Sequence, residues 1–196
     1  PGIYSYGEED LLKECLALKK LGILGVALFP GIEANKKDEI GTEALNPNGL
    51  IPRVIARLKK ECPELLIFAD VALDPYTSHG HDGILSTEKT AVENDKTVKI
   101  LGEMAAVLAS SGADFVAPSD MMDGRIRYIR EKLDECGFQE TGILSYAAKF
   151  ASSFYGPFRD AVGSSGVEKT FSKKGYQLNP ANARESLRDA LLDEEE

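Results

Sequence analysis

The segment 98–119, VKILGEMAAVLASSGADFVAPS, passes once from a helical pattern to a strand-like pattern. Its first part carries apolar residues at the spacing of one helix face, namely Val98, Leu101, Ala105 and Leu108. Gly112 offers an end for this helix, and the short apolar run 113–119 that follows is typical of a buried strand. The segment therefore predicts a helix followed by a buried strand.

The same order of elements recurs on both sides of this segment. The pattern predicts helix and strand pairs at 8–21 and 23–30, at 50–62 and 65–73, and at 126–136 and 143–147, then a short strand at 176–178 and a last helix from about residue 182. Strands that are apolar on both faces and alternate with helices indicate an α/β fold with a parallel sheet.

Two parallel architectures compete for this pattern. A doubly wound nucleotide-binding sheet usually carries a glycine-rich phosphate turn after its first strand, and none is present. A TIM-type (β/α)8 barrel is therefore preferred, although a complete barrel has eight strands and about 250 residues. We expect residues 1–196 to form a single partial barrel domain that lacks the first strand and the last two strands.

The composition narrows the function classes. The chain has 196 residues, 43% of them hydrophobic, which suffices for one core, and its net charge of −9 would repel a nucleic acid. No run approaches the roughly 20 apolar residues of a membrane helix. The three cysteines are widely spaced and form no C-x-x-C motif, as expected in a reducing compartment. We expect a cytoplasmic protein without nucleic-acid or membrane partners.

Polar residues follow the predicted strands at the edge where barrel enzymes place their chemistry. They are Asp70, Asp74, His79, His81 and Asp82 after the second strand, Ser119 and Asp120 after the third, and Ser145, Tyr146 and Lys149 after the fourth. Lys149 stands between Ala148 and Phe150, where desolvation would lower its pKa and leave some neutral amine to form an imine.

Each of these residues also has an ordinary structural interpretation. Lys149 could be ion-paired, and the segment 70–83 could be either a hard-metal site or a hydrogen-bonded loop. Ser119 and Asp120 could cap the following helix. The glycine- and lysine-containing segment 163–175 could be a loop over the site or a solvated linker.

Four segments resemble the porphobilinogen synthase (5-aminolevulinate dehydratase) family: 70–83 (DVALDPYTSHGHDG), 116–125 (VAPSDMMDGR), 145–160 (SYAAKFASSFYGPFRD) and 176–182 (YQLNPAN). The resemblance spans essentially the whole chain. It implies a TIM-type barrel, a homo-octamer assembled through an N-terminal arm, and condensation of two 5-aminolevulinate molecules to porphobilinogen through lysine imines.

The resemblance also implies roles for single residues. Lys149 matches the first imine-forming lysine, and Asp70, Ser119 and Asp120 match residues that hydrogen-bond and transfer protons around the reacting nitrogen. Arg159 and Lys173 match the positions that bind the carboxylate of one substrate, and we place Tyr146 with them as a substrate-binding residue.

The metal residues depart from the zinc-dependent pattern. The three cysteines of zinc-dependent relatives correspond here to Ala72, Asp74 and Asp82. The carboxylate oxygens of the two aspartates favour Mg²⁺ or a monovalent cation over zinc. Asp189 stands where some relatives bind an allosteric magnesium through a glutamate, so we include it as a metal residue with a shorter side chain.

The family's second imine-forming lysine and its N-terminal arm have no counterpart in residues 1–196, so we expect this chain alone to be inactive. Two alternatives remain open. One is another imine-forming barrel, such as an aldolase, that needs one lysine; the other is an inactive remnant or assembly subunit. The resemblance also allows a plastid location in a photosynthetic eukaryote.

Overall fold

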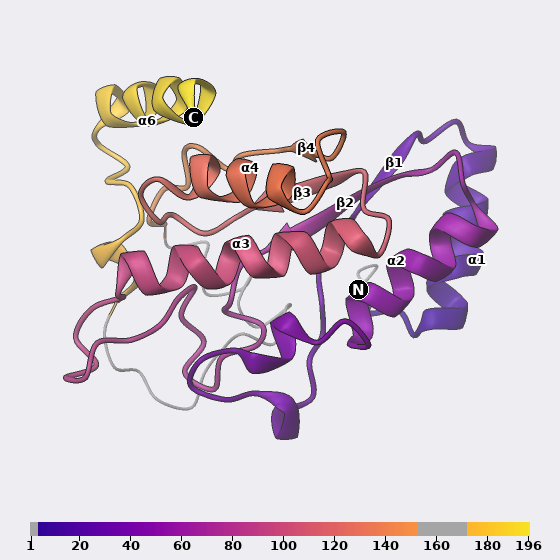
Figure 1. Cartoon of the computed structure of the whole chain (residues 1–196), viewed down its shortest axis with the longest axis horizontal. Coiled ribbons are helices and arrows are strands. Elements are labelled where there is room, and N and C mark those ends of the chain that lie inside the picture. Colours follow the sequence, from indigo (N-terminus) through magenta and orange to yellow (C-terminus); the bar gives the residue numbers. More distant parts are fainter. Residues whose placement is uncertain (1–3, 153–171) are drawn as a thin grey trace.

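A four-stranded parallel sheet forms the centre of the molecule (Figure 1). The computed structural model describes residues 4–152 and 172–196. The strands are β1 (Gly25–Leu28), β2 (Leu66–Val71), β3 (Phe115–Pro118) and β4 (Gly142–Ile143), in the spatial order β1-β2-β3-β4. Each neighbouring pair is parallel, and the order follows the sequence without reversal.

Helices precede and connect these strands, as the helix-then-strand pattern predicts. They are α1 (Glu8–Lys20), α2 (Leu50–Glu61), α3 (Asn94–Ser110), α4 (Arg125–Glu135) and α6 (Ala183–Glu195), with the short 3-10 turns η1 (Ala34–Lys36), η2 (Thr42–Leu45) and η3 (Lys173–Gly175). Figure 1 shows α3 and α4 packed together along the sheet, whereas α6 stands beyond them at one end. In the described ranges no helix is long and apolar enough to cross a membrane.

The core lies on the face of the sheet that α3 and α4 cover. On β2, Ile67, Ala69 and Val71 are completely buried, and they alternate with Phe68 and Asp70 on the other face. The helices contribute large buried side chains to the same cluster, including Ile55, Leu58, Leu101, Met104, Leu108, Ile129 and Leu133. Each such side chain stabilises the fold by roughly 1.5–3 kcal/mol, so β2 is held firmly beneath the site.

Two aromatic rings occupy the other face of the sheet. Phe68 and Phe115 are paired in register and stack with centroids 4.5 Å apart. Glycines on the outer strands leave room for them, because a Cβ on Gly142 would lie 2.3 Å from the Phe115 ring and one on Gly25 would lie 3.0 Å from the Phe68 ring. Since Asp70 follows Phe68 by two residues, the stacked rings lie on the face that carries the site.

Two expected strands differ from the structure. The strand predicted at 143–147 is assigned only over Gly142–Ile143, yet Leu144 and Tyr146 still donate backbone hydrogen bonds to Val116 and Pro118 (2.9 and 3.1 Å). The strand predicted at 176–178 is wrong. Tyr176 ends the η3 turn by donating its backbone N–H to Lys173, and only Leu178 forms a parallel bridge, with Phe150.

Candidate active site

The predicted catalytic residues lie together at the carboxyl end of the sheet. Asp70 is near the end of β2, Ser119 and Asp120 follow β3, and Lys149 follows the chain that runs on from β4. Because parallel strands end at one edge, three separate segments bring their polar side chains to one place. The prediction that these residues converge is therefore supported by the fold.

Lys149 lies among acidic side chains, away from bulk water. Its side chain is 15% exposed, and its Nζ lies 4.0 Å from Asp82 Oδ2 and 6.0 Å from the centre of the Tyr146 ring. Burial raises the pKa values of Asp70 and Asp120, and the positive charge of Lys149 partly opposes both rises. The backbone carbonyl of Lys149 accepts a hydrogen bond from Leu178 (3.0 Å), which fixes the chain at this residue.

Asp70 is a buried carboxyl group that titrates near neutral pH. The pKa of Asp70 is raised from 3.8 to about 7; burial is the largest cause, the hydrogen bond from Ser119 opposes it, and the charge of Asp74 adds to it. Asp70 Oδ1 has no hydrogen-bond partner among the described residues. A carboxyl group with a pKa near 7 can both give and take a proton at neutral pH.

Asp120 has a structural and an electrostatic partner. Its Oδ1 accepts the Met122 backbone N–H at 2.8 Å, and its Oδ2 lies 3.6 Å from Arg125 Nε. The alternative that Ser119 or Asp120 caps the following helix is wrong, because α4 begins after Gly124 and has no side-chain cap. Burial raises the pKa of Asp120 to about 6, against the opposing charge of Arg125. Arg125 in turn bonds to Ser145 Oγ and to the Tyr146 carbonyl, both at 3.3 Å, so it joins the ends of β3 and β4.

Lys173 holds the two acidic residues that the sequence assigns to a metal. Its Nζ donates to Asp82 Oδ1 and lies 3.4 Å from Asp74 Oδ2. Burial lowers the pKa of Lys173, but the charges of Asp82 and Asp74 outweigh burial and raise it. For Asp74, burial raises the pKa, and the charge of Asp82 raises it further. The predicted contact of Lys173 with a substrate carboxylate is therefore replaced here by an internal ion pair.

These carboxylates do not form a metal site as they stand. Their oxygen donors suit a hard cation, and Asp82 Oδ2 is buried without a hydrogen-bond partner in the described residues. However, the Lys173 ammonium lies between Asp82 and Asp74, and within 4–152 and 172–196 no group of three histidine, cysteine or acidic residues is arranged to hold a metal ion. As described, the two carboxylates are paired with the Lys173 ammonium, which a cation would have to displace.

A hydrogen-bonded histidine pair orders the 70–83 segment. His81 Nδ1 lies 3.0 Å from the Tyr176 hydroxyl, the His81 backbone N–H donates to His79 Nδ1 at 3.1 Å, and His79 Nε2 lies 3.1 Å from the Glu39 carbonyl. Sequence reasoning gave Tyr176 no role. The spacing of three residues between Lys173 and Tyr176 is the sequence signal that could have placed them together, since residues i and i+3 share a face of a 3-10 turn.

A family model described as delta-aminolevulinic acid dehydratase matches residues 1–196. The chain belongs to the delta-aminolevulinic acid dehydratase family. The earlier resemblance to that family is confirmed.

Several dehydratases are close in sequence or structure. The chain is 47% identical to the enzyme of Bradyrhizobium diazoefficiens over 98% of this chain and 54% of that protein, and 49% identical to the chloroplastic enzyme 1 of Arabidopsis thaliana over 100% and 45%. A crystal structure of the Toxoplasma gondii enzyme in complex with its reaction product porphobilinogen superposes with a TM-score of 0.96 at 48% identity, covering 100% of this chain and 55% of that one. The chain thus spans about half the length of the dehydratases it matches.

The remaining predicted residues lie elsewhere. Arg159 and residues 163–171 are outside the described part of the chain. Asp189 lines a cavity of about 860 Å³ between α6 and the loop before α4, together with Asp123 and Asp193. Burial raises the pKa of Asp189, and Arg188 opposes this rise. The residues that line this cavity do not include Asp74 or Asp82.

Proposed function

We propose that the full-length protein condenses two 5-aminolevulinate molecules to porphobilinogen, with Lys149 as one imine-forming residue. The observation that carries this proposal is the setting of Lys149: its amine is mostly buried, 4.0 Å from Asp82, beside two carboxyl groups whose pKa values are raised. Membership of the dehydratase family gives this setting its substrate.

Imine formation needs an amine that loses its protons and a ketone oxygen that leaves as water. Lys149 Nζ would attack the ketone carbon after giving a proton to a neighbouring carboxylate, for which Asp82 and Asp120 are candidates. Asp70 would then donate a proton to the departing hydroxyl group, because a pKa of about 7 leaves it largely protonated at slightly acidic pH. Ser119 would tune this step through its hydrogen bond to Asp70.

Arg159, Lys173 and Tyr146 are proposed to bind substrate. A lysine supplies a point charge and an arginine a planar fork for a carboxylate. Lys173 would exchange Asp74 and Asp82 for the substrate carboxylate, or bind it beside them. Tyr146 has its ring near the Lys149 amine, which supports its assignment next to the reacting atoms.

For the metal, we propose Mg²⁺ or a monovalent cation in place of zinc. The segment 70–83 contains no cysteine, and Asp74 and Asp82 offer only hard oxygen donors. Asp189 is proposed to take part in a separate, allosteric magnesium site. Because Asp74 and Asp82 are paired with Lys173, no step of the reaction is assigned to a metal.

We further propose that residues 1–196 belong to a single TIM-type barrel domain and that the four described strands are part of its eight. Strand order β1-β2-β3-β4 supports a barrel, since a doubly wound sheet reverses its order at a switch point. We also propose that the full-length protein is an octamer located in the cytoplasm or a plastid; the bacterial and chloroplastic relatives support the two locations.

Borohydride reduction tests the proposed chemistry. The full-length protein is incubated with 5-aminolevulinate, reduced and digested, and we expect the added mass of a reduced imine on the peptide that contains Lys149. Lys59, which is paired with Asp114 outside the site, is the matched control and should stay unmodified. The role of Lys149 is wrong if its peptide carries no adduct while porphobilinogen is still formed.

A further inference from the structure

The η3 turn presents two side chains to two consecutive residues of the 70–83 segment. Lys173 and Tyr176 are three residues apart, on one face of the turn, and the turn is closed by hydrogen bonds from the Tyr176 and Gln177 backbone N–H groups to Lys173 O (3.1 and 2.9 Å). The Lys173 ammonium donates to Asp82, and the Tyr176 hydroxyl contacts His81 Nδ1 at 3.0 Å. We call these four residues, Lys173, Tyr176, His81 and Asp82, the η3 clamp.

Several hydrogen bonds hold the side of the clamp that the 70–83 segment forms. His81 is held at its backbone N–H by His79 and at its carbonyl by the Thr77 hydroxyl (2.9 Å). The acceptor role of His79 Nδ1 leaves Nε2 to donate to the Glu39 carbonyl. The Tyr176 hydroxyl thus meets a fixed partner, and the Asp82 backbone N–H approaches the same hydroxyl at 3.5 Å.

The other side of the clamp reaches the reacting lysine. Two residues after Tyr176, the Leu178 backbone N–H donates to the Lys149 carbonyl, and Leu178 O accepts from Ala151 (3.0 and 2.9 Å). The clamp therefore joins the segment bearing Lys173 to both the acidic loop and the lysine that lies 4.0 Å from Asp82. Lys173 and Asp82 are 91 positions apart in the sequence, so the clamp joins two distant segments of the chain.

We infer that Tyr176 is a positioning residue that holds Lys173 at the correct distance from the site through its hydrogen bond to His81. This inference rests on the proposed function, because it assigns Lys173 to the substrate carboxylate. Without the hydroxyl, Lys173 keeps its charge but loses the second point of attachment that fixes its turn. Substrate binding should suffer more than turnover.

The test uses Tyr176→Phe in the full-length protein. We expect the KM for 5-aminolevulinate to rise about tenfold while kcat falls less than about threefold, the pattern of lost substrate binding. Tyr128→Phe is the matched control, because the Tyr128 ring packs against Gly102 and no hydrogen bond of its hydroxyl is found in the described residues. It should leave KM unchanged.

A double variant separates the hydrogen bond from general damage. His81→Ala should raise KM by a similar factor, and adding Tyr176→Phe to it should raise KM no further, because partners in one contact are not additive. An unchanged KM in Tyr176→Phe, or KM increases that multiply in the double variant, would overturn the inference. A variant that merely unfolds lowers kcat at constant KM.

Hydrogen exchange of the peptide 79–84 gives an answer that does not depend on turnover. Its amides should exchange about threefold faster or more in Tyr176→Phe than in the wild-type protein, and at the wild-type rate in Tyr128→Phe. If the wild-type protein makes no porphobilinogen, the proposed function fails while the exchange still reports on the clamp. Unchanged exchange in Tyr176→Phe would overturn the clamp itself.

Discussion

At the scale of single residues, the site is a balance of buried charges. Four carboxylates, Asp70, Asp74, Asp82 and Asp120, lie near two ammonium groups, Lys149 and Lys173, with little exposure to solvent. Burial favours neutral carboxyl groups, whereas the lysines favour charged ones. Asp70 lies where burial prevails, which is why its pKa reaches about 7.

The first prediction concerns the pH dependence of stability in Asp70→Asn. Because the folded-state pKa of Asp70 is raised from 3.8 to about 7, the folded protein binds the extra proton between these values, and stability falls as pH rises through that window. At pH 8 the wild type buries a charge that the variant lacks, so the variant should be more stable by up to roughly 4 kcal/mol. Below about pH 4 the two should be alike.

Urea unfolding of the full-length proteins at pH 5 and pH 8, followed by circular dichroism, measures this difference. Asp95→Asn, at an exposed position in the first turn of α3, is the control and should change little at either pH. The Asp70→Asn variant should also lose porphobilinogen formation, whereas Asp95→Asn should keep it. A variant that is less stable than wild type at pH 8 would contradict the high pKa of Asp70.

Sequence reasoning located these residues but not their pairings. Asp70, Ser119, Asp120 and Lys149 could be predicted because parallel strands end at one edge of the sheet. The ion pair of Lys173 with Asp82 could not, because the two are 91 positions apart and depend on how one turn docks on another segment. Patterns along a chain give faces and ends of elements, and they do not give contacts between loops.

At the scale of elements, apolar periodicity was enough to find the helices and the first three strands. It failed at 176–178, where Tyr-Gln-Leu has the composition of a strand but the backbone closes a 3-10 turn at Tyr176. The fourth strand, predicted at 143–147, was also overextended, because only Gly142 and Ile143 pair with β3 in the ladder. Short segments carry too few residues for periodicity to separate strand from turn.

Gly142 leaves space for the stacked rings of Phe68 and Phe115, and filling this space should destabilise the fold. Gly142→Ala should destabilise the protein by about 1–3 kcal/mol, because its Cβ would lie 2.3 Å from the Phe115 ring and force the stack with Phe68 to shift. Gly31→Ala is the matched control, since no atom lies within 4 Å of a Cβ added there.

Urea midpoints of both alanine variants in the full-length protein measure this effect. The control should be unchanged or slightly stabilised, because alanine restricts the unfolded chain. Equal midpoints for the two variants would show that the Phe115 ring can move away from a Cβ at position 142 without cost, and the packing argument for Gly142 would then fail.

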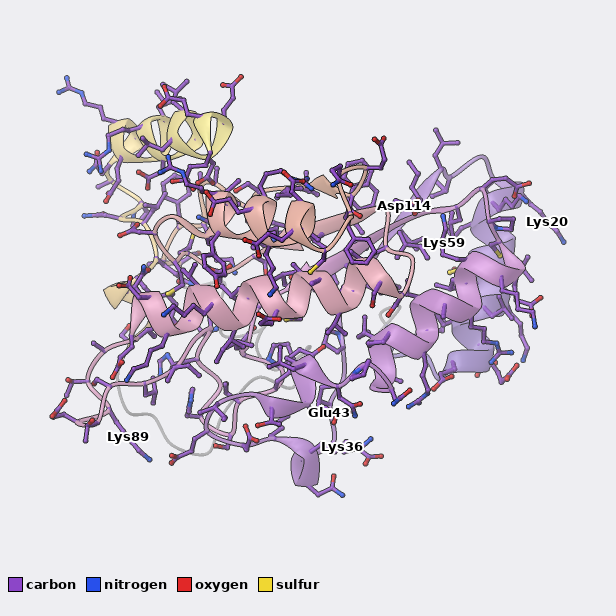
Figure 2. The ribbon with its side chains drawn as sticks, in the orientation of Figure 1. Lys20, Lys36, Glu43, Lys59, Lys89 and Asp114 are labelled. Carbon is purple, nitrogen blue, oxygen red and sulfur yellow. The ribbon has the colours of Figure 1, made fainter. Side chains whose placement is uncertain are left out.

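At the scale of the whole molecule, the sheet is fastened at the end opposite the site. Figure 2 shows Lys59 of α2 and Asp114, just before β3, pointing toward one another. Lys59 Nζ lies 3.0 Å from both carboxylate oxygens of Asp114 and 3.2 Å from the Pro63 carbonyl, while Asp114 Oδ2 accepts the Ile67 backbone N–H at 2.8 Å. One carboxylate thereby joins α2, β2 and β3.

Asp114→Ala should therefore cost more than the loss of an ordinary surface pair. It leaves the Ile67 N–H near the start of β2 without its acceptor, which costs about 1–3 kcal/mol, and it removes the only carboxylate partner described for the Lys59 ammonium, which keeps the Pro63 and Leu65 carbonyls. Asp10→Ala removes a carboxylate from an exposed pair with Lys13 and should change stability by less than about 1 kcal/mol. Thermal unfolding of the two full-length variants at low and high salt compares them directly. The stability lost in Asp10→Ala should shrink at high salt, whereas the stability lost in Asp114→Ala should persist, because partly buried charges are screened less. Equal losses in the two variants would mean that the end of the sheet opposite the site depends on its apolar core alone.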